Sequence, residues 1–111
     1  MSAITTHVLD TALGRPAEGI RVVLERLDGQ DQWKAVGRGS TDADGRLRTL
    51  SNDAVPGTYR LVFDTAAYFT SINASGFYPS VVVTFSVTEA EAHYHVPLLL
   101  SPFGYTTYRG S

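Results

Sequence analysis

The sequence predicts an all-β sandwich of eight strands in two sheets, with one short helix. Three observations support this prediction. Apolar residues alternate along short segments, turn residues separate these segments at close intervals, and a single stretch changes to helical spacing. Alternation matters because successive side chains of a strand point to opposite faces, so one face can enter a core. With 111 residues, we expect a single domain over residues 1–111.

The first half of the chain begins with a strand-like segment at Ile4–Asp10, followed by a Gly- and Pro-containing break at 14–19. Ile20–Leu27 alternates apolar and polar residues and predicts the second strand. A turn at 28–31 then leads into Trp33–Ser40.

The middle of the chain repeats this pattern twice. The sequence Asp-Ala-Asp-Gly at 42–45 predicts a turn into a strand at Arg46–Leu50. Val-Pro-Gly-Thr at 55–58 leads to Tyr59–Asp64, in which every second residue from Tyr59 is aromatic or aliphatic. This face is expected to lie in the core.

One helix is predicted at Thr65–Asn73. Its apolar residues Ala66, Phe69 and Ile72 recur at helical spacing, Asp64 or Thr65 can cap its start, and Gly76 follows its end.

Three strands complete the predicted sandwich: Ser80–Thr88, His93–Leu100 and Tyr105–Arg109. The first alternates strictly, with Val81, Val83, Phe85 and Val87 on the inner face and Val82 among the residues of the outer face. Its outer face is only weakly polar, which suits pairing with another subunit. Pro97 cannot donate to a sheet ladder, so we expect it at an edge, a bulge or a bend.

The histidines are the main chemical feature. His93 and His95 are two residues apart and share one strand face, whereas the opposite face carries Tyr94, Val96, Leu98 and Leu100. His7 lies in the first strand, so all three histidines can converge only if the fold brings the two ends together. Histidine exchanges protons near neutral pH, which makes such a cluster a candidate catalytic site.

Composition excludes several classes of protein. The net charge of −2 gives no basic surface for nucleic acid, and no apolar run approaches the roughly 20 residues of a membrane span. Absence of cysteine excludes disulfides and thiol catalysis. Only three residues precede the first strand-like segment, which leaves no room for a secretory signal, so a cytoplasmic location is expected.

Four motifs occur in order along the chain: Thr6–Asp10, Thr41–Arg46, His93–Ser101 and the final Tyr-Arg-Gly-Ser at 108–111. Together they resemble the transthyretin-like family and, within it, the 5-hydroxyisourate hydrolases of purine (urate) breakdown. The resemblance implies the transthyretin-like sandwich. It also implies hydrolysis of 5-hydroxyisourate to 2-oxo-4-hydroxy-4-carboxy-5-ureidoimidazoline by attack of water on the lactam carbonyl.

The resemblance also implies roles for individual residues. His7 and His95 would share acid–base work, with His93 orienting its neighbour or contributing directly. Arg46 would bind the carbonyl edge of the substrate and stabilise the oxyanion. Tyr108 and Ser111 would belong to the substrate site. In an ideal strand Arg109 points away from Tyr108, so the sequence favours a structural role for Arg109 at least as much as contact with the substrate.

No metal and no cofactor are expected, because the hydrolases of this family work without metal. Three histidines can in principle hold zinc, and this remains a minority alternative. The turn at 42–45 lacks the first and last ligands of a calcium loop.

The family assembles as a homotetramer, a dimer of dimers whose sheets face each other across a central channel with the active sites in it. We therefore expect the small-molecule site to lie at the dimer–dimer interface. Two other functions stay open: a non-catalytic small-ligand carrier of the transthyretin type, and a structural or interaction sandwich. Carriers of that type lack the histidine pair and the terminal motif, and a structural sandwich does not require ionisable groups to converge.

Overall fold

The computed structural model describes residues 2–89 and 91–111, which form nine strands and one helix. The elements are β1 (Ser2–Asp10), β2 (Arg15–Pro16), β3 (Arg21–Leu27), β4 (Trp33–Ser40), β5 (Arg46–Ala54), β6 (Gly57–Phe63), α1 (Thr65–Ser71), β7 (Val81–Val87), β8 (His93–Ser101) and β9 (Gly104–Thr107). The predicted all-β class, the eight principal strands and the short helix are confirmed.

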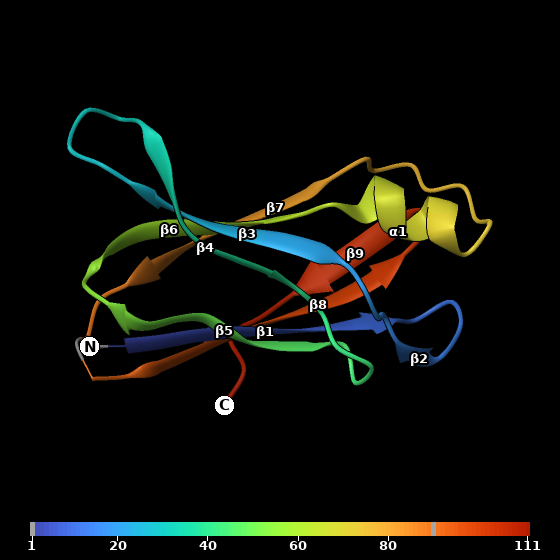
Figure 1. The fold of residues 1–111 in the computed structure, drawn as a ribbon, viewed down its shortest axis with the longest axis horizontal. Helices are drawn as coiled ribbons and strands as arrows, with labels where there is room; N and C mark the ends of the chain where they lie inside the picture. The colour runs from blue at the N-terminus through green and yellow to red at the C-terminus, as the bar shows by residue number, and fades with distance from the viewer. Residues whose placement is uncertain (1, 90) are drawn as a thin grey trace.

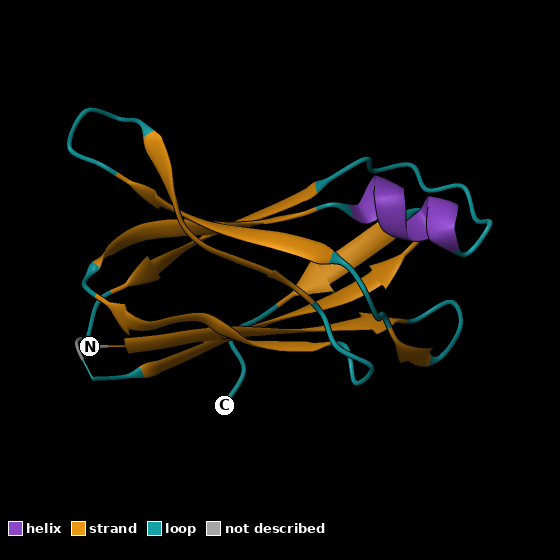
Figure 2. Cartoon of the chain, in the orientation of Figure 1, coloured by secondary structure: helices purple, strands orange, loops and turns teal. Residues whose placement is uncertain are grey.

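The strands form two sheets that pack face to face (Figures 1 and 2). One sheet has the order β2-β1-β8-β9, with β5 also paired to β1. The other has the order β4-β3-β6-β7. In Figure 1 the sheet that contains β1 and β8 forms the lower layer, and α1 lies at one end of the sandwich.

The alternation read from the sequence selects the core correctly. Every second residue of β6 from Tyr59 is buried, as are Val22 and Leu24 of β3. On β8 the face opposite the histidines is buried, because Tyr94, Val96, Leu98 and Leu100 are at most 7% exposed. The histidine face is therefore the outer face of its sheet.

The helix begins where its cap was predicted. The Asp64 side chain accepts a hydrogen bond from the Ala67 backbone N–H. Its buried face consists of Thr65, Tyr68 and Phe69, and Tyr68 donates from its hydroxyl to Asp10 Oδ2 at 2.6 Å. The helix is thereby attached to the end of β1, and Ala66, expected on the inner face, is exposed instead.

The two terminal regions of the chain lie side by side. β1 pairs with β8 in parallel, with Ala3 opposite His93, Thr5 opposite His95 and His7 opposite Pro97. The sequence analysis expected the two ends to converge if the three histidines act together. The parallel register of β1 and β8 produces this convergence.

Three features differ from the expectations. The segment at 14–19, read as a break, contains the two-residue strand β2, paired to the end of β1. The last strand ends at Thr107 rather than Arg109, and only an isolated bridge joins Gly110 to His95. Pro97 lies in an interior strand, within the gap between this bridge and the β8–β9 ladder, where its missing N–H disrupts no ladder bond.

Candidate active site

The centre of the site is a threonine between two histidines. Thr5 Oγ1 lies 2.9 Å from His93 Nε2 and 2.8 Å from His95 Nδ1, within hydrogen-bond distance of both rings. The parallel register of β1 and β8 places this hydroxyl beside the pair, and the two imidazole centroids are 6.1 Å apart. The two rings are therefore held by one buried side chain.

Arg46 enters the site because of the turn that precedes it. Asp42 Oδ1 accepts from the backbone N–H groups of Asp44 and Arg46, both at 2.9 Å. Gly45 has φ +75°, and a Cβ there would lie 2.3 Å from the Val8 carbonyl oxygen, so only glycine fits this close approach. The turn thus fixes the start of β5, where Arg46 pairs with His7 of β1.

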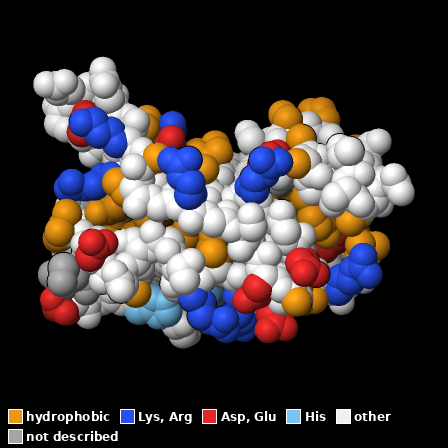
Figure 3. All heavy atoms as spheres, viewed as in Figure 1, with side chains coloured by type: hydrophobic (Ala, Val, Ile, Leu, Met, Phe, Trp, Pro, Cys, Tyr) orange, Lys and Arg blue, Asp and Glu red, His pale blue; other side chains and the backbone are white. Residues whose placement is uncertain are grey.

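These side chains border a shallow cavity of about 170 Å³ on the outer face of the sheet. Its lining residues are Thr5, Thr6, Arg46, Arg48, His93, His95 and Ser111. Histidine and arginine or lysine side chains reach the surface close together in the space-filling view (Figure 3). Arg46 has no carboxylate within ion-pair distance among the described residues, and the cavity is therefore rich in hydrogen-bond donors and positive charge.

His7 lies on the same face but turns toward the adjacent loop. Its Nε2 lies 2.8 Å from the carbonyl oxygen of Asp44, which can only accept a hydrogen bond, so Nε2 carries a proton. In the neutral ring, Nδ1 then holds the free lone pair. His7 neighbours the cavity without lining it.

The environment of His95 favours its neutral form. Burial of the ring is the largest cause of a lowered pKa at His95. The remaining causes are the positive charges of His93, Arg46, His7 and Arg48. His95 is therefore suited to accept a proton at neutral pH, whereas a charged ring would not be.

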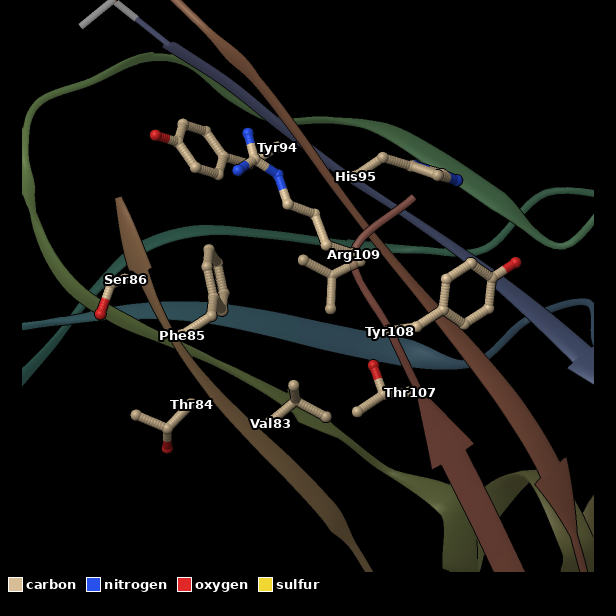
Figure 4. Close-up of a pocket in the computed structure, with 10 residues that line it drawn as sticks. Val83, Thr84, Phe85, Ser86, Tyr94, His95, Thr107, Tyr108 and Arg109 are labelled. Carbon is tan, nitrogen blue, oxygen red and sulfur yellow. The ribbon is translucent and has the colours of Figure 1, made fainter. Parts of the chain in front are cut away.

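The final four residues divide between two sides of the sheet. Arg109 places its guanidinium carbon 4.6 Å from the centroid of the Tyr94 ring, on the inner side. Tyr108 points the other way and is 54% exposed (Figure 4). Tyr108 lines a neighbouring cavity of about 210 Å³ with Arg109, and His95 borders both cavities. Tyr108 and Arg109 lie beyond the end of β9, and their side chains point in different directions although both border this neighbouring cavity.

Gly110 contacts the ring of His95 directly. Its N–H donates to the His95 carbonyl at 2.8 Å, and an added Cβ would lie 2.6 Å from the ring atom Cδ2. The same Cβ would lie 3.3 Å from Pro97, which the tail helps to bury. The glycine of the terminal motif thus lets the tail pass close to the imidazole and helps to hold its orientation.

The structure adds Thr5 and Arg48 to the residues expected from the sequence. Thr5 shares a strand face with His7 two positions away, so alternation could have pointed to it once β1 and β8 were known to pair. Arg48 shares a face with Arg46 in the same way, but its ion pair with Asp42, at 3.7 Å, partly neutralises it. Neither residue has a motif of its own in the sequence.

Within residues 2–89 and 91–111, no group of three or more His, Cys, Asp or Glu side chains is arranged to ligate one metal ion. In the same part of the chain, no helix has the length and apolar character needed to cross a membrane.

Fold and site together define a β-sandwich protein with a basic, histidine-containing cavity on one sheet. The HIUase/Transthyretin family model matches residues 4–110, and the chain belongs to this family. It is 48% identical to the 5-hydroxyisourate hydrolase of Mus musculus, with 99% of this chain and 96% of the mouse protein covered. It is 47% identical to the 5-hydroxyisourate hydrolase of Caulobacter vibrioides, and that match covers both chains completely.

Solved structures of two kinds resemble this one. The 5-hydroxyisourate hydrolase of Klebsiella pneumoniae has a TM-score of 0.88 and 36% identity, with 100% of both chains covered. Sea bream transthyretin in complex with thyroxine has a TM-score of 0.92 and 33% identity, covering 96% of this chain and 93% of that one. Backbone similarity is high for both the hydrolase and the transthyretin, so the fold alone does not distinguish their two functions.

Proposed function

We propose that this protein hydrolyses 5-hydroxyisourate, opening the lactam ring by attack of water. The observation that carries the proposal is the convergence of the histidine pair with Arg46 at one cavity, in a chain 47–48% identical to hydrolases of that name over its length. Hydrolysis of a lactam needs an activated water, a donor for the developing oxyanion and a proton for the leaving nitrogen. The cavity offers a group for each need.

In this proposal His95 is the general base. Its Nδ1 is occupied by Thr5, so Nε2 is the nitrogen available to water. The lowered pKa of His95, caused first by burial, keeps the ring unprotonated and ready to accept a proton at neutral pH. After water attacks the carbonyl carbon, the proton is returned to the ring nitrogen of the substrate as the C–N bond breaks.

Arg46 supplies the oxyanion donor. Its guanidinium is always charged and presents a planar set of N–H groups that match two neighbouring oxygens. The absence of an ion-pair partner among the described residues leaves these donors available to a substrate carbonyl. Positive charge aimed at the carbonyl oxygen stabilises the transition state more than the substrate, which accelerates the chemical step.

His7, Tyr108 and Ser111 complete the proposed substrate site. His7 has a protonated Nε2 bound to the turn at Asp44, so its Nδ1 can accept from a substrate N–H. Ser111 borders the cavity, and Tyr108 is exposed beside His95. Because Tyr108 is exposed in the single chain, we propose that a second copy of the chain covers it and holds it against the substrate.

We also propose a homotetramer, a dimer of dimers with the sites at the interface between dimers. A cavity of about 170 Å³ is smaller than the roughly 300–1,000 Å³ typical of small-molecule sites. Facing it with a two-fold copy would enclose the substrate and exclude water. Among the described residues, β7 and β9 each pair with one neighbouring strand, so these two edges are open to pairing between copies.

The direct test is the ultraviolet absorbance of freshly generated 5-hydroxyisourate, followed with and without the protein. Decay that is faster than the spontaneous reaction and proportional to protein concentration supports the proposal. Decay at the spontaneous rate would refute it. Light scattering at the same concentrations tests the assembly: four copies of the 12.0 kDa chain are expected, and a fully active monomer would refute the interface model.

A non-catalytic ligand carrier is the second candidate, favoured by the likeness to the thyroxine complex of sea bream transthyretin. A carrier does not need a partly buried histidine with a lowered pKa beside an arginine that has no ion-pair partner among the described residues. Saturable binding of thyroxine without hydrolysis would favour this alternative. The cytoplasmic location expected from the sequence also remains a proposal, which fractionation of the source cells would test.

A further inference from the structure

The Thr5 hydroxyl lies within hydrogen-bond distance of one nitrogen of each paired imidazole, His93 Nε2 and His95 Nδ1. Thr5 is only 8% exposed, so water competes little for its oxygen. Both contacts bridge β1 and β8, and the parallel register makes Thr5 the direct neighbour of His95. The hydroxyl is therefore a fixed part of the sheet surface.

A hydroxyl has a single proton, and this restricts the two rings. If His95 Nδ1–H donates to Oγ1, the threonine proton must point to His93 Nε2, which then holds a lone pair. If His93 Nε2–H donates instead, the threonine proton points to His95 Nδ1. While both rings are neutral, the two histidines cannot choose their tautomers independently.

We propose that Thr5 is a positioning residue that couples the tautomers of His93 and His95 and carries a proton between them. In the first arrangement, His95 Nε2 is unprotonated and can act as a base. In the second, His95 Nε2 carries a proton and can act as an acid. Thr5 thus connects the two states that a single histidine must adopt during one hydrolysis. This inference rests on the proposed hydrolase function.

The proton transfers balance. When His95 Nε2 takes a proton from the attacking water, the ring becomes positively charged. The Nδ1 proton then passes to Oγ1, and the original Oγ1 proton passes to His93 Nε2, so the positive charge moves to His93. His95 is now neutral with its proton on Nε2, which it gives to the leaving nitrogen. As this proton leaves, the reverse shift through Thr5 returns a proton from His93 to His95 Nδ1, so His95 stays neutral and the starting state is restored.

The surroundings favour moving the charge outward. His95 is partly buried, whereas His93 is exposed to water, which solvates a charged ring better. Arg46 and Arg48 on β5 and His7 on β1 also bear on His95 and disfavour a positive charge there. A relay to His93 therefore relieves the least favourable charged state of the cycle.

The experiment compares Thr5→Val, which keeps the shape of the side chain without the hydroxyl, with Thr5→Ser, which keeps the hydroxyl. The matched control is Thr11→Val. The Thr11 hydroxyl, just after β1, donates to the Leu100 carbonyl on β8 and makes no hydrogen bond to a histidine among the described residues, so its removal tests the loss of a hydroxyl alone. We expect Thr5→Val to lower kcat at least about tenfold with little change in KM. Thr5→Ser should retain activity within about threefold, and Thr11→Val should match the unmodified protein.

Two readouts separate this role from simple loss of structure. First, Thr5→Val should move the acid limb of the kcat/KM profile to lower pH, because the charged His95 ring loses an acceptor for its N–H. Second, nitrogen-15 NMR of the imidazoles should show opposite, linked tautomers in the unmodified protein and in Thr5→Ser, but not in Thr5→Val. Circular dichroism and thermal melting verify folding of each variant.

The outcomes distinguish the two proposals. If the unmodified protein does not accelerate substrate decay but its histidine tautomers are linked, the hydrolase function fails and the coupling by Thr5 stands. If the protein is active and folded Thr5→Val keeps the same kcat, pH profile and tautomers, the coupling is overturned. A loss of kcat that Thr5→Ser does not restore would also overturn it, because a hydroxyl would then not be the requirement.

Discussion

The outer faces of the two sheets each carry a cross-strand pair that includes an arginine. In one sheet the arginine faces a carboxylate, and in the other it faces a histidine. On β3 and β6, Glu25 lies opposite Arg60, and Arg60 Nε donates to Glu25 Oε1 at 2.6 Å. On β1 and β5, His7 lies opposite Arg46, so both members of the pair are basic. Glu25 and Arg60 neutralise each other. The positive charge of Arg46 is not neutralised by an ion pair among the described residues, so it remains available to a ligand.

This difference separates a stabilising surface from a functional one. Opposite charges directly across a sheet contribute a few tenths of a kcal/mol to about 1 kcal/mol, and like charges are destabilising. Arg60 gains further contact by lying 4.1 Å above the Trp33 ring centroid. Arg46 has no ion-pair partner among the described residues, so its guanidinium remains available to a ligand.

The largest loss of activity is expected from His95→Asn, on the face that carries the candidate site. Asparagine keeps a polar group on the strand but cannot accept a proton near neutral pH, so kcat should fall by about 100-fold or more. Thermal melting should change little, because the ring lies on the outer face. Substrate decay and melting curves measured on the same preparation check this. Near-normal turnover in a folded variant would remove the acid–base role from His95, and His7→Asn tests the partner histidine in the same way.

The pH dependence should follow the same residue. Because the folded pKa of His95 lies below its ordinary value of 6.5, the neutral ring predominates at pH 6.5 and the charged ring becomes the major form only at lower pH. Activity should therefore persist as the pH falls to 6.5 and decline below it. Between 6.5 and the folded pKa the unfolded chain binds more protons, so the free energy of unfolding decreases as the pH is lowered through this window. An acid limb centred above 6.5 would contradict the assignment.

Arg46→Lys sharpens the comparison by keeping the charge and removing the planar donor set. We expect kcat/KM to fall about tenfold, less than the roughly 10²–10³ cost of losing an oxyanion donor entirely. Saturation curves for the two proteins provide the measurement. An unchanged curve would mean that charge alone is needed at this position and that no two-pronged contact exists.

Gly110→Ala should have a smaller, several-fold effect on activity. The new methyl group would lie 2.6 Å from His95 Cδ2, so the tail or the imidazole must move. Gly29→Ala is a suitable control, because a Cβ there meets nothing within 4 Å. If both variants hydrolyse substrate at the same rate, the tail does not orient the ring.

Glu25→Gln on the opposite sheet should give the smallest effect. Loss of the ion pair with Arg60 should lower the free energy of unfolding by about 1 kcal/mol or less, since both side chains are partly solvated. Activity per folded molecule should not change. Denaturant unfolding together with the ultraviolet assay tests both statements, and a clear loss of kcat would show that the two faces are not independent.

The strands were predictable because their signal is local. Alternation in β3, β6, β7 and β8 reflects burial on one side only, and the sequence records it directly. The two-residue strand β2 carries no such alternation and exists because the end of β1 offers it backbone partners. The early end of β9 at Thr107 has a similar cause, since Pro97 on β8 cannot continue the ladder there.

The candidate site was predictable in part. The face shared by His93 and His95, the turn before Arg46 and the opposite directions of Tyr108 and Arg109 all follow from spacing. Thr5 could not be selected, because its importance depends on which strand lies beside β1. The division of Tyr108 and Ser111 between two neighbouring cavities also needed the structure.

The sequence by itself determined the strand faces, the turns and the residue types capable of proton transfer, because these depend on neighbours close in the chain. The parallel pairing of β1 and β8 depends on contacts between residues 90 positions apart, and only the tertiary structure decided it. That pairing brings Thr5 between His93 and His95. It also gives His95 the burial and the nearby positive charges that lower its pKa, since these arise from packing rather than from residue type.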